Sequence, residues 1–175
     1  YSSTSAFAGN PLLISMERLA QHGWLSEGDL GSLSDEVGPI DYEAVSRVKF
    51  PLLEQASRNF LERLSGNAKD RFENFCAQNQ WWLEDFVLFD SLRTHYVGTR
   101  WEQWPRKLAR HYAEELDVAR QEMATELAMR RVIQFFFYEQ WNALRQYCAQ
   151  RSIRIVGDIA IFVDYDSADV WTHPD

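Results

Sequence analysis

A long segment without glycine or proline, residues 114–150, most constrains what this chain can fold into. Leu, Ala, Glu, Gln and Arg dominate the segment, and because these residues have high helix propensity, the sequence predicts one long helix. The second half of the segment is apolar nearly all round, from Val132 to Tyr147. A helix of that kind is expected to be buried on several sides rather than to lie on a surface.

Shorter helices are predicted before this segment. Residues 13–21 favour a short helix, and Asp41 is placed to cap the next one, which Pro51 should kink or split in two. Two further helices are expected over residues 72–79 and 82–96, where apolar residues recur at helical spacing.

The pattern changes at residues 153–163, which read Ile-Arg-Ile-Val-Gly-Asp-Ile-Ala-Ile-Phe-Val. This run is β-branched and too continuously apolar for an exposed strand, so it predicts a strand covered on both faces, as in parallel sheets. A lone strand is not stable, and its sheet partners are therefore expected outside these 175 residues. The predicted fold class is a mostly α-helical segment with one buried strand, cut from a larger α/β fold.

Asp158 is the most informative candidate for a functional residue, because a carboxylate inside an apolar strand is costly to bury without partners. It should face a ligand, or else be a structural residue paired with an arginine or with backbone amides. The loop that follows carries Asp164, Asp166 and Asp169, but it lacks the spacing of a calcium-binding EF-hand. Capping of a helix by Asp166 or Ser167 is the favoured role.

Composition narrows the class of protein. The 18 Lys and Arg residues against 26 Asp and Glu leave a net charge of −8, which argues against nucleic acid or an anionic membrane as a partner. Two cysteines and four histidines without metal-ligand spacing predict no disulfide framework and no metal site. The cysteines are expected to be reduced thiols in a cytoplasmic compartment. Aromatic residues make up 14% of the chain, and although most should lie in the core, flat apolar faces also suit sugar rings.

Motifs spread along the whole chain resemble those of the amylomaltases, or disproportionating enzymes, which are 4-α-glucanotransferases of the α-amylase clan. In chain order the motifs are Tyr1-Ser-Ser-Thr-Ser-Ala-Phe-Ala-Gly-Asn-Pro11, Trp82-Leu-Glu-Asp-Phe86, Trp101-Glu-Gln-Trp-Pro105, Phe137-Tyr-Glu-Gln-Trp141, Gly157-Asp-Ile-Ala-Ile-Phe-Val163 and Asp166-Ser-Ala-Asp-Val-Trp171. Two positions depart from the family pattern, since Ala160 stands where the family usually has Pro and Asp164 where it often has Ala.

The resemblance implies part of a (β/α)8 barrel with helical insertions. Residues 1–12 would be a barrel loop after a strand, and residues 13–113 a helical insertion subdomain. Residues 114–175 would supply the long helix, a barrel strand and the loop after that strand.

The resemblance also implies an activity on α-1,4-glucans and maltooligosaccharides, without a metal or organic cofactor. Family members hold a glucan as a covalent ester on an Asp and pass it to the 4-hydroxyl of another sugar. Tyr1 and Asp158 match family residues that contact the donor sugar, whereas nothing here matches the catalytic carboxylates, so this segment alone is expected to be inactive. Two alternatives remain, a non-catalytic helical module that binds glucan or protein, and a related α-glucan hydrolase.

Overall fold

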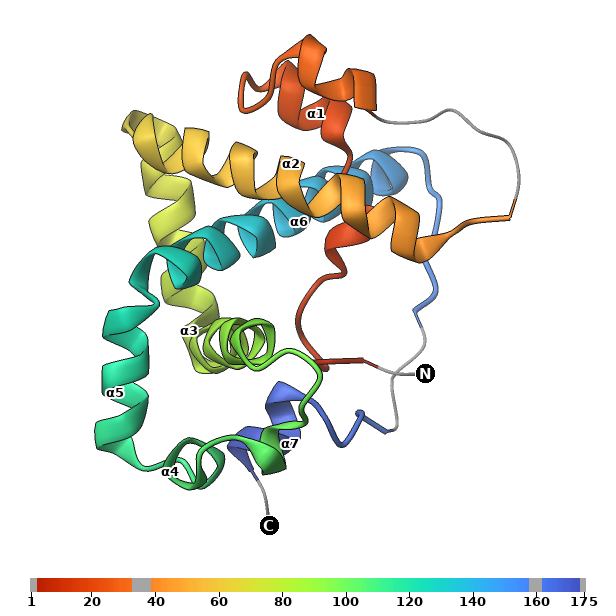
Figure 1. Ribbon diagram of the computed structural model, residues 1–175. Helices are drawn as coiled ribbons and strands as arrows, with labels where there is room; N and C mark the ends of the chain where they lie inside the picture. Colours follow the sequence, from red (N-terminus) through yellow and green to blue (C-terminus); the bar gives the residue numbers. More distant parts are fainter. Residues whose placement is uncertain (1–2, 33–38, 158–161, 174–175) are drawn as a thin grey trace. The chain divides into compact units, whose positions relative to one another are not determined.

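The computed structural model describes residues 3–32, 39–157 and 162–173 (Figure 1). The α-helices are α1 (Met16–Gln21), α2 (Tyr42–Glu62), α3 (Gly66–His95), α4 (Arg106–Ala109), α5 (Ala113–Glu122), α6 (Ala124–Gln150) and α7 (Ala168–Thr172), and the 3-10 helices are η1 (Pro11–Leu13), η2 (Glu27–Ser32) and η3 (Trp101–Gln103). None of the helices in these three ranges is long and apolar enough to cross a membrane.

The predicted buried strand at residues 153–163 is wrong for the residues that the structure describes. Residues 153–157 have no regular secondary structure, and the side chains of Val156 and Phe162 are 91% and 83% exposed. A strand needs a neighbouring strand to satisfy its backbone N–H and C=O groups, and the described residues contain no β-strand to provide one. The described chain is therefore all-helical, rather than helical with one strand of a (β/α)8 barrel.

The chain forms two compact units, and it passes from one to the other after Ala8, within α3, within α6 and after Ile155. Unit 1 comprises Tyr1–Ala8, Phe75–Arg131 and Val156–Asp175, and unit 2 comprises Gly9–Asn74 and Val132–Ile155. The division into segments 1–12, 13–113 and 114–175 that the resemblance implies follows the order of the chain and stays a prediction.

The helix predictions are confirmed in kind and corrected at their boundaries. Asp41 caps α2 as predicted, because its carboxylate accepts hydrogen bonds from the backbone N–H groups of Glu43 and Ala44. Pro51 does not split this helix, which is continuous across it. The two helices expected over residues 72–96 form the single helix α3, since no glycine or proline separates them.

The predicted single helix over residues 114–150 is broken at Met123. Its backbone angles, φ −103° and ψ 20°, end α5, and α6 begins at the next residue (Figure 1). The break lets α5 bury Leu116 and Ala119 while α6 buries Leu127, so tertiary packing overrides helix propensity here. The predicted all-round burial of the later part holds at Val132 but fails toward Tyr147, which is exposed.

An aromatic cluster forms the core of unit 1. The rings of Phe89, Trp104 and Trp171 contact one another, with centroids 5.5 to 5.7 Å apart. Trp171 is fully buried, and its indole N–H donates to the backbone carbonyl of Leu108 at 3.3 Å. The cluster therefore joins α3, the residue that follows η3, α4 and α7.

A second aromatic cluster forms the core of unit 2. Phe60 of α2 contacts the rings of Phe72, Phe135 and Phe136 at 5.4 to 5.6 Å. The contacts with Phe72 and Phe136 are edge-to-face, and such packing adds to the free energy gained from burying apolar area.

Two glutamines of α6 hold the N-terminal part of unit 2. The Gln134 side chain accepts from the backbone N–H of Gly9 at 2.8 Å and donates to its carbonyl at 3.1 Å. Gln140 bonds Ser15 in the same way, at 2.8 and 3.1 Å. A Cβ atom at Gly9 would lie 2.0 Å from the ring of Phe137, so this close approach of backbone to helix requires glycine.

Candidate functional site

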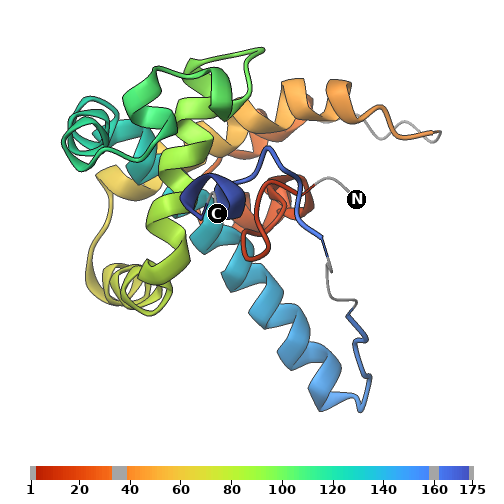
Figure 2. The ribbon, with the colours of Figure 1, turned by 90° about the horizontal axis from the view of Figure 1, so that it is seen from below.

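The first described residues of the chain lie beside α7 in unit 1, where Figures 1 and 2 both draw them side by side. The backbone N–H of Ala6 donates to the Asp169 carboxylate at 2.9 Å, and the backbone N–H of Ala168 donates to the carbonyl of Thr4 at 2.9 Å. These bonds bring the first and the last motif of the sequence together.

The segment that leads into α7 is tied to η3 and α3. The indole N–H of Trp101 donates to the carbonyl of Tyr165 at 2.9 Å, and its backbone N–H donates to the Asp166 carboxylate at 3.4 Å. Arg93 pairs with the same carboxylate at 3.7 Å. Asp166 therefore positions the chain before α7 by contacting two other elements.

The predicted capping role is confirmed at Ser167, whose hydroxyl accepts a hydrogen bond from the backbone N–H of Val170 at 3.3 Å. Asp164 instead accepts from the backbone N–H of Asp166 at 2.9 Å. Within the described ranges, no group of three or more His, Cys, Asp or Glu side chains could hold a metal ion.

Tyr1 and Asp158, the two site residues that the sequence predicts, lie outside the described residues. Their contact with a donor sugar stays a prediction. What the structure does bring together is the surrounding set of motifs, namely the N-terminal segment, the segment at Trp101 and the Asp166–Trp171 segment.

An exposed aromatic pair lies on this unit and was not singled out from the sequence. The Phe7 ring meets the Trp81 ring edge-to-face at 4.6 Å, and the two side chains are 42% and 64% exposed. Exposed tryptophan faces can contact the apolar C–H surface of a ligand. The adjacent Trp82 is buried. Two consecutive tryptophans in the sequence do not by themselves indicate which of the two rings faces solvent.

His111 is packed in the core of unit 1. Its ring lies 4.0 Å from the ring of Trp171, and its backbone adopts a left-handed conformation with φ 57°. Burial lowers the pKa of the His111 imidazole below its usual range. The His111 ring, half-buried beside the Trp171 indole, therefore packs in unit 1.

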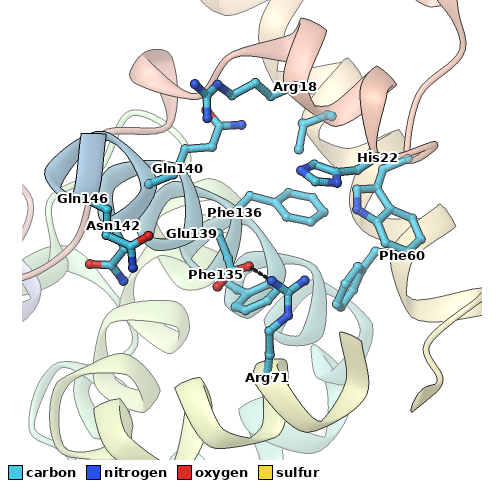
Figure 3. Close-up of a pocket in the computed structure, with 13 residues that line it drawn as sticks. Arg18, His22, Phe60, Arg71, Phe135, Phe136, Glu139, Gln140, Asn142 and Gln146 are labelled. Atoms are coloured by element: carbon cyan, nitrogen blue, oxygen red, sulfur yellow. Dashed lines mark ion pairs between the residues drawn. The ribbon is translucent and has the colours of Figure 1, made fainter. Parts of the chain in front are cut away.

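Unit 2 contains a cavity of about 360 Å³, and Figure 3 shows the side chains that converge on it from α1, α2, α3 and α6. Its apolar wall is formed by Trp24, Phe60, Phe135 and Phe136. Its polar rim includes Arg18, Arg71, Glu139, Gln140, Asn142 and Gln146. A size of several hundred Å³ with an aromatic wall and a few convergent polar groups is typical of small-molecule sites.

Two residues on the rim of this cavity form an ion pair: the Arg71 guanidinium lies 2.5 Å from the Glu139 carboxylate (Figure 3). The pair offers hydrogen-bond donors and acceptors side by side. The sequence predicts a buried helix at Phe135 and Phe136 but gives no sign of the cavity, because the polar groups around it come from distant parts of the chain.

Comparison with known proteins identifies the family. The family model described as 4-alpha-glucanotransferase matches residues 1–175, and the chain therefore belongs to this family. A 4-alpha-glucanotransferase of Thermus thermophilus is 39% identical over 175 residues, which are 100% of this chain and 34% of that protein. One from Streptococcus pneumoniae is 37% identical, covering 99% of this chain and 34% of that protein.

A solved structure agrees with these sequence matches. The amylomaltase of Streptococcus agalactiae, in complex with acarbose, superposes with a TM-score of 0.91 at 33% identity, covering 99% of this chain and 35% of that one. The resemblance found in the sequence motifs is thus confirmed. The chain spans about a third of the length of the relatives that it matches.

Proposed function

We propose that this chain is a segment of a retaining 4-α-glucanotransferase. The enzyme would transfer α-1,4-glucan units from one maltodextrin to the 4-hydroxyl of another. The observation that carries the proposal is the family match over residues 1–175, with 39% identity to a protein of that name across the whole chain. The acarbose complex of the similar amylomaltase supports α-glucans as the class of ligand.

The reaction that we propose needs two displacements at the anomeric carbon of the donor. In the first, an Asp carboxylate bonds to that carbon while the glycosidic C–O bond breaks and an acid protonates the leaving oxygen. In the second, the 4-hydroxyl of the acceptor displaces the Asp and gives its proton to the same acid/base group. The bonds broken and formed balance without water and without a metal or organic cofactor.

Tyr1 and Asp158 would contact the donor sugar beside the bond that is cleaved. Sequence matching supports these roles, since both residues stand at family motif positions. The nucleophile and the acid/base are expected in other parts of the longer chain, so residues 1–175 alone should be inactive. The cytoplasmic location expected from the few cysteines is part of the same proposal.

Incubation of the full-length protein with maltotriose tests the proposal. A transferase produces glucose together with longer maltodextrins, because each glucan unit removed is added to another chain. A hydrolase of the same clan would give shorter sugars only, and a non-catalytic helical module would leave maltotriose unchanged. Either of the last two results would overturn the proposal.

A further inference from the structure

We propose that the cavity of unit 2 between Trp24, Arg71 and Gln146 binds one end of a short α-1,4-glucan; this inference rests on the proposed function for the class of its ligand. The cavity is built from α1, α2, α3 and α6 (Figure 3). Every described residue that lines it belongs to unit 2, whereas Tyr1 and Asp158, the residues proposed to contact the donor sugar, lie outside the described residues.

The wall of the cavity provides a fixed apolar surface. Phe60, Phe135 and Phe136 are buried and pack against one another at 5.4 to 6.3 Å. Trp24 is only partly buried and meets Phe60 edge-to-face at 4.9 Å. A partly exposed indole can contact the C–H face of a glucose ring, which is the apolar part of that sugar.

The wall is held in place before any ligand binds. The Asn59 amide donates to the carbonyl of Trp24 at 2.9 Å, and Arg63 donates to the carbonyl of Gly23 at 3.2 Å. Gln140 fixes α6 to Ser15 on the other side. A preformed site loses less conformational entropy on binding than one that must be ordered.

The rim presents the groups that a polyhydroxyl ligand requires. Glu139, Asn142 and Gln146 recur at three- and four-residue spacing on α6, so they share one face of the helix. Arg71 faces them from α3 and pairs with Glu139 at 2.5 Å. Guanidinium and amide N–H groups donate, while carboxylate and amide oxygens accept, and a sugar hydroxyl can do both.

The charge balance favours a neutral ligand over an anion. The Arg71 charge is compensated by Glu139 within the cavity. Arg18 adds one positive charge, but its side chain is exposed, where water weakens its attraction for an anion. A neutral sugar therefore fits this rim better than a sugar phosphate.

Fluorine NMR of the full-length protein labelled with 5-fluorotryptophan tests the inference, with maltotriose as the probe. The Trp24 signal is identified by its loss in Trp24→Phe. We expect this signal to shift saturably with maltotriose; the products that transfer would form during the titration are glucose and longer α-glucans. In Arg71→Ala the dissociation constant should rise about fivefold or more, because hydrogen bonds to charged groups contribute most.

Lys69→Ala is the matched control, since it removes an exposed ion pair with Glu73 on the same helix; it should leave the dissociation constant unchanged. Asn142→Ala removes a rim amide at an exposed position of α6, so it provides a second test of the rim with little risk to folding. A Trp24 signal that does not move, an equal dissociation constant in Arg71→Ala, or tighter binding of glucose 1-phosphate than of maltotriose would each overturn the inference. Formation of longer maltodextrins on the same samples tests the proposed function separately.

Discussion

The carboxylate of Asp169 accepts a hydrogen bond from the backbone N–H of Ala6 at 2.9 Å, although the two residues are 163 positions apart in the chain. A second bond, from the N–H of Ala168 to the carbonyl of Thr4 at 2.9 Å, lies directly beside it. The N-terminal segment, which carries the motif that starts at Tyr1, is thereby anchored to α7.

Substitution of Asp169 should release this segment. We expect Asp169→Ala to lower the free energy of unfolding by about 1 kcal/mol, or the melting temperature by about 2–4 °C, and to speed hydrogen exchange at the Ala6 amide. Asp117→Ala is the control, because it removes an ion pair with Arg120 that lies on an exposed helix face. Unchanged exchange at Ala6 in Asp169→Ala would show that the anchor does not depend on this carboxylate.

The two glutamines that hold unit 2 should differ in their contribution to stability. Gln134 is 1% exposed, so Gln134→Leu leaves the N–H and C=O of buried Gly9 without partners, at a cost of about 2–4 kcal/mol. Gln140→Leu should cost about 1 kcal/mol or less, because water can reach partly buried Ser15. Urea unfolding of both variants measures the difference, and equal costs would contradict the role of burial.

His111 makes the stability of unit 1 depend on pH. Burial lowers the pKa of its imidazole in the folded state; nearby Asp85 raises that pKa, while Arg120 and His173 lower it. Because the unfolded state then binds the proton more readily, the stability from His111 is fully present above the unfolded pKa of about 6.5. It is lost as the pH falls from there toward the folded pKa.

We therefore expect the free energy of unfolding to fall as the pH drops below about 6.5, and to fall less steeply in His111→Asn. Apart from glycine, asparagine tolerates the left-handed backbone of this position better than other residues without a titrating side chain. Parallel pH curves for the two proteins would show that His111 does not contribute to the pH dependence.

Helix-forming segments were predictable from the sequence, because capping residues and apolar spacing are local signals. Asp41 and Ser167 cap the helices as their side-chain chemistry indicates. The break at Met123 was not predictable, since no glycine or proline marks it and the cause lies in how α5 and α6 bury their own apolar faces. A long run of good helix formers shows that helix is possible there, not that it is continuous.

The strand prediction was wrong for a different reason. Val156 and its neighbours have β-branched side chains that suit a strand, but a strand forms only with a partner, and pairing is a property of the tertiary structure. The family was predictable because its motifs are contiguous in the sequence. The cavity of unit 2 was not, because Trp24, Arg71 and Gln146 come from separate helices and loops.

Asp158→Asn in the full-length protein separates the proposed ligand role of this residue from a structural one. If Asp158 contacts the donor sugar, the transfer rate should fall about ten- to hundredfold while the melting temperature changes little, because a charge-assisted hydrogen bond is weakened. If it is instead paired with a buried arginine, the free energy of unfolding should fall by about 3–5 kcal/mol. Intact activity per folded molecule with a large drop in melting temperature would refute the ligand role.

The transfer of a glucan to a sugar acceptor is the central claim, and labelled glucose tests it most directly. The full-length protein is incubated with unlabelled maltoheptaose and uniformly ¹³C-labelled glucose, and the products are separated by length and weighed by mass spectrometry. A 4-α-glucanotransferase should place the ¹³C-labelled glucose at the reducing end of maltooligosaccharides, because the 4-hydroxyl of glucose accepts the glucan. Shortening of maltoheptaose while all of the label stays in free glucose would contradict transfer and indicate hydrolysis.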